Sequence, residues 1–180
     1  TLGGNNQYTG VTTINAGTLS VATIGNGGVA GNLGQATNAA SNIVIGGGTL
    51  QYTGSTASTD RAFTLTASTT GTIDVTQSGT TLTISGASAN TTGALTKIGS
   101  GTLTLGAANL YTGLTTVTAG TLTEGIANAL SSGALTVNGG TFNIGAYSDT
   151  VGAVTIGTSG GTISGTTGVL TGTSLSLIHI

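Results

Sequence analysis

The 180-residue sequence contains no cysteine and no proline, and only 3% of its residues are charged. Without cysteine, disulfides and thiolate metal sites are excluded. An ordinary domain is about a quarter charged, so the scarcity of charge is far from average. The ionisable side chains other than tyrosine occur singly or as one adjacent pair, and they are Asp60, Arg61, Asp74, Lys97, Glu124, Asp149 and His179.

This charge distribution excludes several function classes. A net charge of −2 with only two Lys and Arg residues argues against nucleic-acid binding, because phosphate contacts draw on several cationic side chains. The same shortage argues against binding to an anionic membrane surface. No apolar run approaches the roughly 20 residues of a membrane-spanning helix, so direct membrane insertion is not expected. The start, Thr1–Gly4, does not resemble a secretion signal, and we expect the chain to begin within a longer pattern.

Glycine is abundant, at 34 residues, and this excludes long helices because each interior glycine costs a helix about 1 kcal/mol. Only residues 35–42 are expected to form a short helical turn. Apolar residues instead alternate in short bursts, as at Leu50/Tyr52, Ile73/Val75 and Leu103/Leu105. A period of two indicates short β-strands with one buried face.

A recurring phrase indicates how these strands are arranged. Gly-Thr-Leu or a close variant begins at residues 17, 48, 71, 101, 120, 140 and 161. Stacked coils place like residues on like, so the repetition favours a solenoid over an antiparallel sandwich. With about 22 residues in each turn, the chain is predicted to form an all-β solenoid of roughly 7 to 8 coils. Leu50, Ile73 and Leu103 should line a common interior.

A longer duplication is more specific. Residues 6–19 match residues 109–122 at an offset of 103, and ten of the fourteen positions are identical. The second copy is preceded by Gly101-Thr102-Leu103-Thr104-Leu105 and contains Asn109, Tyr111-Thr112-Gly113, Thr115-Thr116-Val117 and Ala119-Gly120-Thr121-Leu122. This phrase resembles the autotransporter-associated β-strand repeat, also called the passenger-associated transport repeat.

The resemblance implies a right-handed parallel β-helix on the bacterial cell surface or released from it, exported by type V secretion. It implies one partner, an outer-membrane β-barrel translocator of the same polypeptide outside this chain. The expected role is a non-enzymatic stalk or spacer that assists export and displays an adhesin or effector, without cofactors. We assign residues 1–173 to the β-helix fragment. Residues 174–180 depart from the pattern and resemble a translated sequencing adaptor, so we expect a truncation or sequencing artefact there.

An enzyme on this scaffold would need two carboxylates on one face. The acids at 60, 74, 124 and 149 could converge on stacked turns, but the simpler interpretation places Asp60 and Arg61 in a solvated turn and Asp74 facing water. His179 has no partner at metal-ligand spacing. We therefore predict no catalytic, cofactor-binding or metal residues.

Three binding functions are alternatives to the stalk. Tyr8, Tyr52, Tyr111 and Tyr147 could stack on sugars, although two of them belong to the repeat phrase and are interpreted as structural. Thr-x-Thr strands begin at residues 64, 81, 102 and 121 and would present outward hydroxyls, as on an ice-binding face. Their unequal spacing of 17, 21 and 19 residues argues against a flat face. An adhesive face for host or sister cells is the third interpretation.

Overall fold

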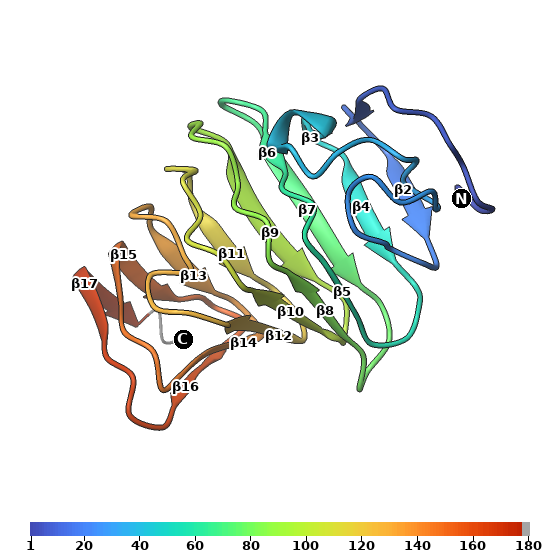
Figure 1. Cartoon of the computed structure of the whole chain (residues 1–180). Coiled ribbons are helices and arrows are strands. Elements are labelled where there is room, and N and C mark those ends of the chain that lie inside the picture. Colours follow the sequence, from blue (N-terminus) through green and yellow to red (C-terminus); the bar gives the residue numbers. More distant parts are fainter. Residues whose placement is uncertain (178–180) are drawn as a thin grey trace.

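The computed structural model describes residues 1–177 and shows an all-β chain wound into a parallel β-solenoid (Figure 1). Every pair of adjacent strands is parallel. The coils stack from β2 near the N-terminus to β17 at the opposite end of the row. The predicted fold class is confirmed.

The strands form three sheets that follow the faces of the coil. The eight-stranded sheet contains β2 (Thr18–Val21), β4 (Thr49–Tyr52), β7 (Thr70–Val75), β9 (Ala94–Ile98), β11 (Thr115–Val117), β13 (Leu135–Val137), β15 (Asp149–Ile156) and β17 (Leu170–Leu177). The six-stranded sheet contains β5 (Ala57–Thr59), β8 (Thr81–Ile84), β10 (Thr102–Leu105), β12 (Thr121–Glu124), β14 (Thr141–Gly145) and β16 (Thr162–Gly165). The three-stranded sheet contains β1 (Thr12–Ile14), β3 (Ile43–Ile45) and β6 (Thr64–Leu65).

The apolar interior is built from columns of side chains in register. In the six-stranded sheet, one inward column consists of Ala57, Leu82, Leu103, Leu122, Phe142 and Ile163. Leu50, Ile73 and Leu103 are all buried in one core cluster, as the alternation predicted. Each fully buried aliphatic side chain contributes about 1.5–3 kcal/mol before chain entropy is subtracted. No coil can bury its own residues alone, so stability depends on stacking.

The number of coils is slightly smaller than predicted. The solenoid makes about six turns, in line with the six strands of the β5 to β16 sheet, rather than seven to eight. The estimate assumed equal coils of about 22 residues. In fact Thr18 pairs with Thr49, 31 residues later, because residues 22–42 make a long excursion between β2 and β3. This excursion contains the only helical turn in the described chain, a 3-10 helix at Ala40–Asn42, within the segment where a short turn was expected.

The Gly-Thr-Leu phrases stack on one another, but in two different sheets. Thr18, Thr49 and Thr72 form one column in the eight-stranded sheet. Thr102, Thr121, Thr141 and Thr162 form another in the six-stranded sheet. The phrase therefore marks a corner followed by a strand, and it does not mark one face. At Gly120 the backbone φ is +60° and an added Cβ would collide with the carbonyl oxygens of Gly99 and Gly101, so only glycine fits this corner.

The proposed boundary at residue 173 does not coincide with the end of a strand. Residues 174–177 continue β17 and pair with Ala153 to Ile156 of β15. His179 lies outside the described residues. Within residues 1–177, no helix is long and apolar enough to span a membrane.

Candidate functional site

Arg61 is buried in the first coils, which contradicts the predicted solvated turn. Arg61 is only 2% exposed, and its guanidinium donates hydrogen bonds to four carbonyl oxygens of the 22–42 excursion. Those acceptors are Gly25 at 3.0 Å, Val29 at 3.2 Å, Gly34 at 2.8 Å and Ala36 at 3.1 Å. Because a guanidinium has five N–H donors in a rigid fork, it can organise a loop that lacks regular structure. Arg61 therefore serves the fold of the excursion.

Asp60 supports the same loop from its other side. Its carboxylate accepts hydrogen bonds from the backbone N–H of Gly27 at 2.7 Å and from the Asn38 amide at 3.2 Å. The Asn26 side-chain oxygen in turn accepts from the backbone N–H of Asp60 at 3.1 Å. The asparagine side chains of this segment thus hold the turn at Asp60 by hydrogen bonds.

Lys97 occupies an inward position in the eight-stranded sheet, between Ile73 and Val117 of the adjacent strands. The residue is 0% exposed, and its ammonium group donates to the carbonyl oxygens of Ile98, Gly99 and Ala119 at 2.7, 2.9 and 3.3 Å. Burial lowers the pKa of Lys97 to about 8, and the negative charge of Asp74 opposes that shift. The ammonium thus binds the Gly99 corner of its own coil and the Ala119 carbonyl oxygen of the next coil.

Asp74 is also buried, at 8% exposure, so the expectation that it faces water is wrong. One carboxylate oxygen accepts a hydrogen bond from the Gln51 amide at 2.9 Å in the preceding coil. The other oxygen has no hydrogen-bond partner among the described residues. Asp74 lies over the corner at Gly99, the same corner that Lys97 binds from inside.

Glu124 and Asp149 lie next to each other inside the solenoid, and both residues are 2% exposed. Asp149 accepts hydrogen bonds from the backbone N–H groups of Leu130 at 2.9 Å and Thr150 at 2.6 Å. Burial raises the pKa of Glu124 well above its usual range, and the adjacent Asp149 carboxyl adds to this shift. Two of the four acids therefore converge, as the sequence left open.

The converging carboxyl pair is closed to a substrate because it is enclosed by the coils. Asp60 and Asp74 lie elsewhere, at the 22–42 excursion and over the Gly99 corner. Within residues 1–177, no group of three or more histidine, cysteine or acidic residues is placed to hold a metal ion. The charged residues of the described chain thus contact backbone groups, neutral amide side chains or each other.

Each of the two repeat-phrase tyrosines, Tyr8 and Tyr111, makes a local hydrogen bond to a threonine hydroxyl. The Tyr111 and Thr115 hydroxyls form a hydrogen bond of 2.7 Å, and the Tyr8 and Thr12 hydroxyls form one of 2.8 Å. Tyr111 is fully buried, and burial raises the pKa of its hydroxyl. Tyr52 is also buried and donates to the Ser55 carbonyl oxygen at 2.6 Å. These contacts agree with a structural role for the tyrosines of the phrase.

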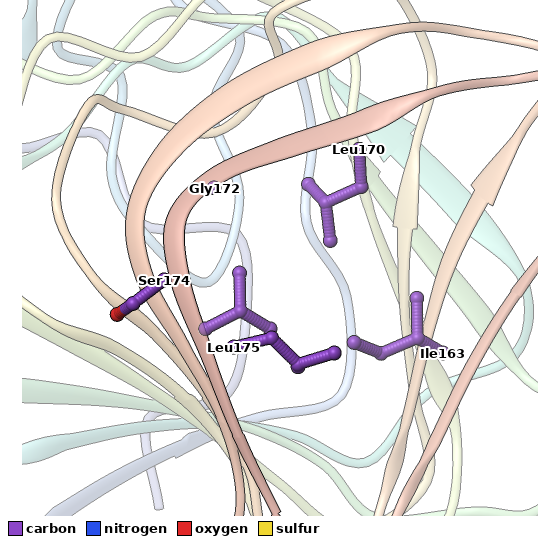
Figure 2. Close-up of a pocket in the computed structure, with 6 residues that line it drawn as sticks. Ile163, Leu170, Gly172, Ser174 and Leu175 are labelled. Atoms are coloured by element: carbon purple, nitrogen blue, oxygen red, sulfur yellow. The ribbon is translucent and has the colours of Figure 1, made fainter.

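A hollow of about 340 Å³ lies between β15, β16 and β17. Figure 2 shows the side chains of Ile163, Leu170 and Leu175 pointing into one space, with the Ser174 hydroxyl directed away from it. Leu175 and Ile163 occupy the inward columns that Leu135 and Leu103 occupy in earlier coils. The hollow is therefore a continuation of the apolar interior and has no polar group suited to hold a ligand in place.

The outer faces carry columns of threonine in register. On the eight-stranded sheet a single column runs through all eight strands, and it consists of Thr18, Thr49, Thr72, Thr96, Thr116, Thr136, Thr155 and Ser176. The six-stranded sheet carries two columns, Thr81, Thr102, Thr121, Thr141 and Thr162 beside Ser58, Thr83, Thr104, Thr123, Asn143 and Ser164. Thr64 belongs to β6 and lies outside this array.

Stacked coils with an apolar interior, glycine corners and hydroxyl-bearing faces define a repeat-built parallel β-solenoid. A family model described as the passenger-associated transport repeat matches residues 1–21 and 95–123. These ranges contain the two copies of the duplicated phrase. Over these two ranges the chain is therefore similar to the passenger-associated transport repeat, and the resemblance drawn from the sequence is confirmed.

A curated relative supports the same assignment. The chain is 48% identical over 66 residues to the protein named "Adhesin BmaC autotransporter" of Brucella suis biovar 1 (strain 1330). The match covers 37% of this chain and 2% of that much longer protein. None of the solved structures matches the chain.

Proposed function

We propose that the chain is a non-enzymatic stalk segment of an autotransporter passenger that spaces an adhesin or effector from the cell surface and assists export. The observation that carries this proposal is the continuous register of the eight-stranded sheet, whose parallel strands form one ladder from β2 to β17. At about 4.8 Å for each strand, seven steps give a rod of roughly 34 Å. A rod of this kind can act as a spacer without a binding or catalytic site.

The repeat and the adhesin relative support a proposed location and a proposed partner. We place the chain on the bacterial surface, exported through the outer membrane by a translocator domain of the same polypeptide. Burial of Glu124 and Asp149 supports a non-enzymatic role, because a glycosidase needs carboxylates that reach its substrate. Stepwise stacking supports a role in export, because each coil that folds outside the cell can bury its apolar residues against the coil already folded beside it.

Grafting tests the proposal directly. The 180-residue chain would be placed between a signal peptide and an outer-membrane translocator, and surface display would be measured by protease accessibility on intact cells. We expect display of the native chain and a marked loss with Leu103→Asp and Leu122→Asp, which put charges into the inward column. The control carries Thr104→Asp and Thr123→Asp on the outer face of the same strands. Equal display of all three chains would contradict an export role for the folded coils.

A specific observation also favours ice binding as a second candidate function. The uneven spacing along the sequence does not disturb the face, because Thr81, Thr102 and Thr121 are paired strand by strand. Turns absorb the differences in coil length. The two columns repeat about every 4.8 Å across strands and about 6.6 Å along them, and they carry no charge. Thermal hysteresis of the purified chain tests this candidate, with Thr104→Lys and Thr123→Lys as the array variant and Thr116→Lys and Thr136→Lys as the control on the other sheet.

The thermal-hysteresis result discriminates between the two candidate functions. Hysteresis that the array variant removes and the control variant retains would establish ice binding at the six-stranded face. A native chain without hysteresis would exclude it and would leave the stalk proposal intact. Binding to cells or cell extracts that both variants retain would instead indicate an adhesive surface elsewhere on the solenoid.

A further inference from the structure

One acidic side chain stands in the solenoid interior at a position that neighbouring coils fill with aliphatic groups. Glu124 ends β12, and it pairs with Leu105 of the preceding coil. Ile84 stands in the same column one coil earlier. In the first copy of the duplicated phrase, the residue at the offset of 103 is Val21, which is fully buried. Glu124 thus replaces the aliphatic residue found at the equivalent position in the preceding coils and in the first copy of the phrase.

The surroundings of Glu124 suit a neutral carboxyl and not an anion. Both of its oxygens are buried without a hydrogen-bond partner among residues 1–177. The neighbouring Asp149 has the opposite arrangement, because two backbone N–H groups donate to its oxygens. Donors of this kind stabilise a carboxylate. Asp149 is therefore built to carry the negative charge of the pair, and a second charge on Glu124 would meet it in an apolar interior.

No cation is placed to neutralise a second charge within the described chain. The sequence has two Lys and Arg residues. Arg61 binds the carbonyl groups of the 22–42 excursion, and Lys97 binds those at the Gly99 corner. The other titratable group that faces Asp149 is Tyr111, whose hydroxyl is paired with Thr115 and is neutral at ordinary pH.

We propose that folding of the coils around Glu124 takes up one proton, so that the Glu124 and Asp149 pair makes this part of the solenoid acid-stabilised. The inference concerns the folding of the chain itself and does not depend on its proposed role in export. The folded chain keeps Glu124 protonated, whereas the unfolded chain releases that proton once the pH exceeds the ordinary glutamate value of 4.5. Folding then requires a proton from solution, and higher pH opposes it.

The sign and size of the effect follow from proton linkage. Below pH 4.5 both states hold the proton and this residue adds no pH dependence. Above that value the unfolded state binds fewer protons, so the folding equilibrium constant falls by up to about tenfold for each pH unit. The decline continues until the folded carboxyl itself ionises.

Urea unfolding of the 180-residue chain between pH 5 and pH 8, followed by circular dichroism, tests the proposal against a Glu124→Gln variant. Glutamine keeps the shape of the side chain and has no proton to release. We expect the folding constant of the native chain to fall relative to that of the variant by up to about tenfold for each pH unit. Asp60→Asn is the matched control, because Asp60 lies in the first coils and its substitution should leave the native slope unchanged. Equal slopes for the native chain and Glu124→Gln would overturn the proposal.

A second measurement keeps the proposal testable if the glutamine variant fails to fold. Infrared spectroscopy of the native folded chain at pH 7 should show the carbonyl stretch of one protonated carboxylic acid. That band should disappear on unfolding at the same pH. A folded chain at pH 7 without this band has an ionised Glu124, and the proposal would be wrong.

Discussion

The two copies of the duplicated phrase share ten of fourteen residues and one local hydrogen bond, yet they lie in different parts of the coil. In the second copy, Thr115–Val117 belongs to the eight-stranded sheet and Thr121–Glu124 to the six-stranded sheet. In the first copy, Thr12–Ile14 belongs to the three-stranded sheet and Thr18–Val21 to the eight-stranded sheet. The phrase is therefore rotated by one face of the solenoid between its two occurrences.

Burial separates the copies more sharply than hydrogen bonding does. Tyr111 is 0% exposed and Tyr8 is 37% exposed, although each hydroxyl is paired with the threonine four residues later. Asn109 binds the coils on both sides, through the backbone N–H of Ser88 and the Ala129 carbonyl oxygen. The phrase thus encodes a local tyrosine–threonine hydrogen bond, and packing by the neighbouring coils determines how much that bond contributes to stability.

The largest expected difference between the copies comes from removing the tyrosine ring. Tyr111→Ala should lower the free energy of unfolding by about 3–5 kcal/mol, because it leaves a cavity in a packed interior. Tyr8→Ala should cost less than about 1 kcal/mol, as expected for an exposed side chain. Urea unfolding followed by circular dichroism measures both values. Equal losses would show that the ring acts through its own turn and not through stacking.

The corner glycines give the next comparison. Gly17 and Gly120 are equivalent, with φ of +66° and +60°, but an added Cβ at Gly17 meets nothing within 4 Å while one at Gly120 meets backbone oxygens of the preceding coil. Gly17→Ala should therefore cost only the left-handed strain, about 1–2 kcal/mol. Gly120→Ala should add about 1–3 kcal/mol of crowding. Thermal unfolding of the two variants would contradict this account if Gly17→Ala proved the more damaging.

These comparisons show what the sequence could and could not predict. The period of two and the Gly-Thr-Leu phrase predicted the solenoid and the shared interior of Leu50, Ile73 and Leu103, because those signals are local and repeat in every coil. The rotation of the phrase was missed. It occurs between the phrases at Gly71 and Gly101, because Thr72 pairs with Thr96 in the eight-stranded sheet, whereas Thr102 pairs with Thr81 in the six-stranded sheet.

The burial of Arg61 and Asp74 was missed for a different reason, because both residues were expected to face solvent, and no expectation was drawn for Lys97 or Glu124. A signal was present in two cases. Lys97 follows Leu95 by two residues and Glu124 follows Leu122 by two, and alternation puts both members of each pair on the inward face. Arg61 and Asp60 gave no such signal, since their partners lie in an irregular loop about 25 to 35 residues earlier in the chain.

The smallest expected difference isolates the hydroxyl pair itself. Thr115→Val keeps the shape of a buried side chain and leaves the Tyr111 hydroxyl without its partner, which should cost about 1–2 kcal/mol in urea unfolding. Thr12→Val should change stability by only a few tenths of a kcal/mol, because the Tyr8 hydroxyl can turn to water instead. Adding Tyr111→Phe to Thr115→Val removes both polar groups and should recover most of the loss. If the double variant is no more stable than Thr115→Val, the threonine contributes through packing alone, and the tyrosine–threonine hydrogen bond in the two copies differs only in how tightly its atoms are enclosed.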